Sequence, residues 1–163
     1  MKILSMKTTI FLGAMLSLLV CLMFTGCSNS ETNSTSRGLT DFAHIEEEYL
    51  ATIDSLNWPD GITLPDKLED EDTGASFQVG YGETRASYLW EYSWMKEWLD
   101  TYNTDPERAE KAVEELEKAF DMPYMGIDRC DDATRNYLRE NIDKAKLGDP
   151  SGFTESIRAN YAN

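Results

Sequence analysis

The chain has 163 residues, of which 30 are acidic and 15 are basic, and its formal net charge at pH 7 is −15. This length suits one globular domain, and such an acidic surface repels phosphate backbones, which excludes nucleic acid as an expected partner. A single histidine excludes a histidine-rich metal site, and we expect neither a metal nor a cofactor.

The first part of the chain has the pattern of an export signal. Lys2 and Lys7 precede an apolar run over residues 10–24, and a stretch rich in Ser, Asn and Thr follows over residues 28–38. A transmembrane helix needs about 20 apolar residues to cross the hydrocarbon core. The run is shorter than that, so it predicts a signal peptide in preference to a permanent membrane span.

The residues Phe24-Thr25-Gly26-Cys27 resemble the lipobox of bacterial lipoproteins. In that family the thiol of the final cysteine receives a diacylglycerol, and a peptidase then cuts just before it. The resemblance implies a signal peptide over 1–26. The polar composition of the next residues predicts a flexible tether over 27–38, and the helical spacing beyond it predicts a single helical domain over 39–163. The implied location is the extracytoplasmic face of the cell membrane, through lipid on Cys27. Ordinary secretion and an uncleaved signal anchor stay open as alternatives.

Beyond the tether, apolar residues recur at the spacing of helices. A first helix is predicted over about 40–56, and it ends before Pro59 and the turn pair Asp60-Gly61. Alternating apolar residues over 75–81 then predict a short strand, which we expect to pair with residues 62–64 in a hairpin.

A second helix, predicted over about 84–102, is so apolar that we expect it to lie centrally. Its predicted inner stripe consists of Tyr88, Tyr92, Met95, Leu99 and Tyr102. A third helix is predicted to start with a capping box formed by Thr104 and Glu107. A fourth is expected over about 132–147, and a short fifth after Pro150. The pattern predicts a mainly α fold, a compact bundle of four to five helices with at most one short β-hairpin.

The tryptophans are the first candidate binding residues. Trp90, Trp94 and Trp98 are spaced four apart on the second helix, and Trp58 lies in a loop. Exposed aromatic rows bind sugars or partner peptides, but the apolar character of this helix favours packing in the core. Trp90 points away from the predicted stripe, so Trp90 and Trp58 are the two tryptophans proposed for binding.

Glu91 is the second candidate, because its position on the helix falls inside the apolar face. A buried carboxylate must be paired or protonated. Arg129, Arg135 and Arg139 are the candidate partners for an ion pair. A structural ion pair, or a position at the rim of the apolar face that reaches solvent, is the favoured interpretation, and a functional acid is the alternative.

Cys130 and His44 offer little chemistry. Cys130 is flanked by acids, which raise the pKa of a thiol, the wrong direction for a nucleophile. We therefore expect a small, half-buried cysteine. His44, the only histidine, is expected to be a partly exposed structural residue on the first helix.

Calcium is suggested by the acid-rich segments 66–72 and 128–132. An EF-hand loop starting at Asp66 would place Leu68 at its third position and Glu71 where glycine is required, so the match fails. Solvated acidic loops are the favoured interpretation, and a looser carboxylate site in a calcium-stabilised surface domain stays open as a weaker alternative.

Residues 77–83, followed by an aromatic helix with Trp90 and Trp94, resemble small exported proteins of Gram-positive bacteria, a likeness that implies no activity. Two hypotheses for function follow. The first is a non-enzymatic binding module on the cell surface for a protein or small ligand, with Trp58 or Trp90 exposed. The alternative is a small extracytoplasmic enzyme in which Glu91 and a second acid converge in a cleft.

Overall fold

The structure, a computed structural model, describes residues 38–69 and 71–161. The predicted signal peptide, the lipobox with Cys27 and all of the predicted tether except Gly38 lie outside the described residues. Within the described part, the chain is mainly α-helical, with one two-stranded antiparallel sheet. The predicted fold class is therefore confirmed.

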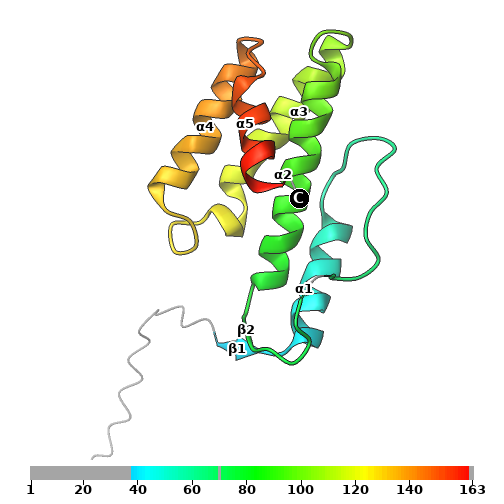
Figure 1. Ribbon diagram of the computed structural model, residues 1–163, viewed down its shortest axis with the longest axis vertical. Helices are drawn as coiled ribbons and strands as arrows, with labels where there is room; N and C mark the ends of the chain where they lie inside the picture. The colour runs from blue at the N-terminus through cyan, green and yellow to red at the C-terminus, as the bar shows by residue number, and fades with distance from the viewer. Residues whose placement is uncertain (1–37, 70, 162–163) are drawn as a thin grey trace, which may run out of the picture. The chain divides into compact units, whose positions relative to one another are not determined.

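Five α-helices form the body of the described domain (Figure 1). They are α1 (Phe42–Ser55), α2 (Tyr81–Thr101), α3 (Pro106–Glu117), α4 (Asp132–Lys146) and α5 (Ser151–Asn160). Two short 3-10 helices, η1 (Lys118–Asp121) and η2 (Pro123–Met125), lie between α3 and α4. No helix in the described ranges combines the length and the apolar character needed to cross a membrane.

The small sheet pairs β1 (Leu39–Thr40) with β2 (Phe77–Gln78), so that Thr40 lies opposite Phe77. The predicted strand around Phe77 is confirmed, but its predicted partner, residues 62–64, is wrong. The strands precede α1 and α2, which both start beside the sheet (Figure 1). The long connection between the helices runs back along the domain, which brings together strands that are far apart in the sequence.

The start of α2 is fixed to α1 by a carboxylate and a glycine. The side chain of Glu48 accepts hydrogen bonds from the backbone N–H groups of Gly80 (2.7 Å) and Gly82 (3.2 Å), which have no partner within the helix. Gly80 adopts a left-handed conformation with φ of 88°, which glycine tolerates without strain. At Gly82 a β-carbon would lie 1.8 Å from the carbonyl oxygen of Ile45, so only glycine permits this approach of the two helices.

The core consists of two clusters that both include residues of α2. Ala86 packs in one cluster with Ile45, Tyr49 and Ile53 of α1. In the other, Trp90, Trp94, Met95 and Trp98 pack against residues of α3, α4, α5 and η2. The predicted inner stripe is therefore displaced. Of its members only Met95 is fully buried, while Tyr88 is 42% exposed. A central helix is confirmed, but it buries a wider arc than one stripe because it has neighbours on two sides.

Aspartates cap the starts of three of the five described α-helices. Asp41, Asp105 and Asp131 each accept the backbone N–H three residues ahead, at the starts of α1, α3 and α4. The predicted cap of α3, Thr104, is one residue early. Pro106 occupies the first turn of α3, as its fixed φ favours.

Replacing Gly82 with alanine tests the contact between α1 and α2. The added methyl group must push apart two backbones, so we expect the free energy of unfolding to fall by about 3 kcal/mol or more. Urea denaturation followed by circular dichroism measures the loss. Gly38→Ala is the matched control, because a β-carbon there has no heavy atom within 4 Å. Equal stabilities for the two variants would contradict the close approach.

Candidate functional site

The two tryptophans proposed for binding lie against the core. Trp90 is 1% exposed, and its indole N–H donates to the carbonyl oxygen of Asn57 at 2.8 Å. The prediction of an exposed Trp90 is therefore wrong, because α1 and the loop after it cover the side of α2 that was expected to face solvent. Trp58 is half-buried, contacts both core clusters and donates its indole N–H to Ile53. Trp58 therefore fills a seam between the clusters.

Glu91 lies inside the apolar face of α2 as predicted, and it is buried, with 7% of its surface exposed, so the expected position at a rim that reaches solvent is wrong. Its partner differs from the expected arginine: the hydroxyl group of Tyr124 donates to Oε2 of Glu91 at 2.8 Å. Tyr124 belongs to η2 and is itself 3% exposed. The site therefore contains a carboxyl group and a phenol buried together, and among the described residues no cation pairs with Glu91.

The three predicted arginine partners are engaged elsewhere. Arg129 pairs with Glu83 at 2.8 Å near the start of α2. Arg135 bonds to Asp132 and to the backbone oxygen of Cys130. Arg139 lies 4.6 Å from the centre of the Phe120 ring and bonds to Asn136.

Burial determines the protonation of Glu91. Removal of the carboxylate from water raises its pKa from 4.5 to about 7, although the hydrogen bond from Tyr124 acts in the opposite direction. Burial, reinforced by the nearby Glu91 carboxyl group, raises the pKa of Tyr124, so its phenol stays protonated and remains a donor. Glu91 can therefore gain or lose a proton near neutral pH while staying in place.

A hollow of about 300 Å³ opens in front of Glu91 between α2, η2, α4 and α5. Its volume is at the lower end of the range for small-ligand sites. Aromatic, apolar and small polar side chains form its wall, and Glu91 is the only lining residue with a carboxyl group or a basic side chain. The lining residues are Tyr88, Glu91, Met125, Thr134, Tyr137, Leu138, Ser156, Asn160 and Tyr161.

Tyrosines gather around this hollow and its two neighbours. One neighbour, of about 620 Å³, shares Tyr88, Asn160 and Tyr161 with it. The other, of about 180 Å³, shares Tyr88 and includes Tyr124. Tyr88 packs edge-on against Tyr124 with ring centres 5.7 Å apart, and Tyr92 contacts Tyr161 at 5.0 Å. Together these contacts make a tyrosine-rich surface next to the buried acid.

A further hollow, of about 470 Å³, lies over α3 and the ends of α2 and α4. Trp98, Tyr102 and Val113 contribute apolar wall, and Glu110 and Glu114 contribute acids. These glutamates are exposed, unlike Glu91. The hollow over α3 therefore combines an apolar wall with solvated acids. Among its described lining residues, no buried polar side chain faces its interior.

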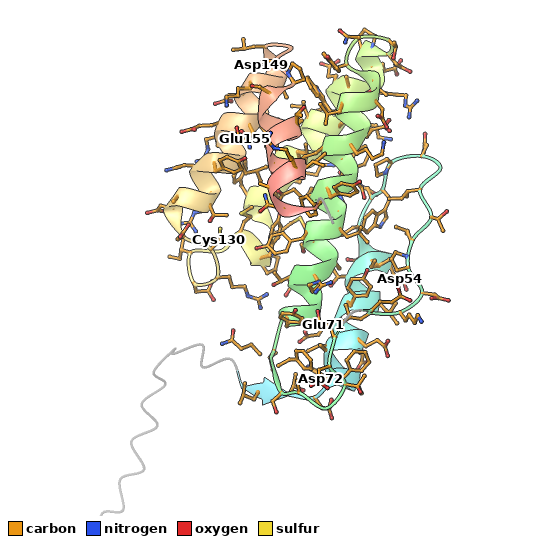
Figure 2. The ribbon with its side chains drawn as sticks, viewed as in Figure 1. Asp54, Glu71, Asp72, Cys130, Asp149 and Glu155 are labelled. Atoms are coloured by element: carbon orange, nitrogen blue, oxygen red, sulfur yellow. The ribbon has the colours of Figure 1, made fainter. Side chains whose placement is uncertain are left out.

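Cys130 and His44 differ in their burial and in their contacts. Cys130 is half-buried in the loop before α4 (Figure 2), and burial more than the neighbouring Asp131 raises the pKa of its thiol. His44 is exposed and lies 3.4 Å from Glu48. Within residues 38–69 and 71–161, no group of three or more His, Cys, Asp or Glu side chains is placed to hold a metal ion.

Sequence reasoning identified Glu91 but missed its surroundings. Tyr124, Tyr137 and Ser156 come from three separate elements, η2, α4 and α5, and Tyr161 follows the end of α5, so no local motif connects them. The available signal was the tyrosine content, eight residues in 163, which indicates surfaces for recognition but gives no position.

No protein-family model, curated protein or solved structure matches this chain. The function is therefore argued from the geometry of the site around Glu91.

Proposed function

We propose that this protein is a lipoprotein held on the extracytoplasmic face of the cell membrane through Cys27, and that its helical domain is a non-enzymatic binding module. The ligand site is the hollow in front of Glu91. The observation that supports it most is the burial of one protonatable carboxyl group at the wall of a tyrosine-lined hollow. A buried carboxyl group lowers the stability of the fold when it ionises. A purely structural role therefore gives no reason to keep a glutamate at this position.

The alternative, an enzyme that uses carboxylates, requires a second acid opposite Glu91. Among the described residues that line the hollow, Glu91 is the only aspartate or glutamate. General acid–base catalysis by two carboxylates needs both groups at the reacting atoms. Side chains of Thr134, Ser156 and Asn160 offer hydrogen bonds for orienting a ligand, which favours binding over hydrolysis.

The anchor is supported by the order of features at the start of the chain: basic residues, an apolar run, a small pair and Cys27. Two acyl chains hold a protein stably, because each buried methylene contributes about 0.8 kcal/mol. The polar residues after Cys27 lack apolar side chains to bury and are suited to a tether.

Replacing Cys27 with serine tests the anchor. Because the acyl chains attach to this sulfur, we expect the variant to lack the diacylglycerol mass, whereas Cys130→Ser keeps it. Mass spectrometry of the native protein should find a diacylglycerol-modified Cys27 at the N-terminus. An unmodified Cys27 in the native protein, or a diacylglycerol mass that persists in Cys27→Ser, would rule out lipid anchoring through Cys27.

A blocking substitution tests the binding module. Thr134 is an exposed residue of α4 that lines the hollow, so Thr134→Trp should fill it without disturbing the core. Ligand-observed NMR with a library of neutral, cationic and anionic small molecules should find compounds that bind the full chain but not this variant. Ala133→Trp is the matched control, because Ala133 is exposed in the same turn and outside the lining. If no compound binds the full chain, the binding proposal fails.

A further inference from the structure

We infer that the hollow in front of Glu91 binds a small organic cation, with an alkylammonium group facing the carboxylate and its methyl or methylene groups against the tyrosine rings. This inference rests on the proposed binding function and adds the chemical class of the ligand. It combines three observations: the charge of the lining, the nature of its walls and the proton held by Glu91.

The charge of the lining favours a cation. Glu91 is the only carboxylic acid of the lining, and no lysine, arginine or histidine belongs to it. An anionic ligand would therefore meet a carboxylate with no compensating positive charge. The whole chain, with its net charge of −15, also concentrates cations near its surface.

The walls suit the apolar part of an alkylammonium ion. Tyr88 and Tyr137 line the hollow and are 42% and 39% exposed, so a ligand can reach their rings. Tyr161 adds a third aromatic ring. The face of an aromatic ring attracts a cation within about 6 Å of its centre, and desolvation strengthens this attraction. One carboxylate surrounded by several rings is the arrangement that recognises quaternary and primary ammonium groups.

Cation binding is coupled to release of the proton from Glu91. The free protein holds this proton below pH 7, because burial raises the pKa of the carboxyl group to about 7. A bound ammonium ion stabilises the ionised carboxylate, so the proton passes to solvent. Apparent affinity therefore rises with pH up to about 7 and then levels off. The dissociation constant at pH 6 should be about tenfold higher than at pH 8.

Glu91 is the residue of the site that titrates between pH 6 and 8, because the phenols around it stay neutral in that range. Burial raises the pKa of Tyr88, of Tyr124 and of Tyr161, so these phenols stay neutral between pH 6 and 8. Tyr137 faces the hollow from α4, and burial also raises the pKa of Cys130 in the preceding loop. Arg135, the charged residue next to that loop, is held by Asp132 and by backbone oxygens, outside the lining.

The experiment uses choline and its neutral isostere 3,3-dimethyl-1-butanol, in which carbon replaces the charged nitrogen. Binding to the full chain in a non-ionic detergent is measured by calorimetry at pH 6 and pH 8. We expect choline to bind at least tenfold more tightly than the isostere at pH 8, with the pH dependence given above. Choline binding should fall at least tenfold in Glu91→Gln and in Thr134→Trp, whereas Glu155→Gln, an exposed position on α5 (Figure 2), should leave it unchanged.

Equal affinities for choline and the isostere, or an affinity for choline that does not change between pH 6 and 8, would overturn the cation proposal. These measurements use the unaltered chain, so they hold even if Glu91→Gln does not fold. If choline does not bind but other compounds bind the full chain and not Thr134→Trp, the cation proposal is also overturned. The proposal of a binding module would then still stand. If no compound binds the full chain, both the cation proposal and the proposed binding function are wrong.

Discussion

The structure depends on the close contact of α2 with neighbours on two sides. At its start α2 approaches α1 so closely that Gly82 leaves no room for a β-carbon beside Ile45. Further along, Trp90 and Trp94 both donate their indole N–H groups to the carbonyl oxygen of Asn57, at 2.8 and 3.1 Å. These contacts fix the rotation of α2. That rotation turns Glu91 inward, to the side occupied by η2, α4 and α5.

Burial of Glu91 is therefore a consequence of how the central helix is held, and its chemistry follows from that position. A carboxyl group that is buried away from water, with one phenolic donor, keeps its proton to a higher pH than an exposed glutamate does. Tyr124 restrains the carboxyl group without neutralising it. Any cation that enters the hollow then meets a group ready to ionise, whereas water alone leaves it protonated.

Local pattern in the sequence predicted the helices well and the long-range contacts poorly. The helix starts follow from capping residues and periodicity, which are local, and errors there amount to a few residues, as at Asp105 in place of Thr104. The strand at Phe77 was predicted, but its partner was not, because pairing with Thr40 depends on α1 and α2 starting at the same end. A hairpin prediction considers only neighbouring segments.

At the site too, the local position of a residue was predicted and its long-range partner was not. Helical angles predicted the position of Glu91 within an apolar face, but they left open whether its carboxyl group is buried or reaches solvent at the rim. Its partner was expected to be an arginine, because a buried charge needs a partner. Instead η2 brings Tyr124 within hydrogen-bond distance, a contact between residues 33 positions apart that no spacing rule reveals. Trp90 was misjudged because a single stripe was assumed for a helix with two buried sides.

The central claim is that Glu91 is a buried carboxyl group that titrates near neutral pH. A carbon-13 NMR titration of the side-chain carboxyl groups tests it directly, with the Glu91 signal assigned by its loss in Glu91→Gln. The account predicts a midpoint at about pH 7 for this signal. A midpoint near 4.5, the value for an ordinary glutamate, would contradict it.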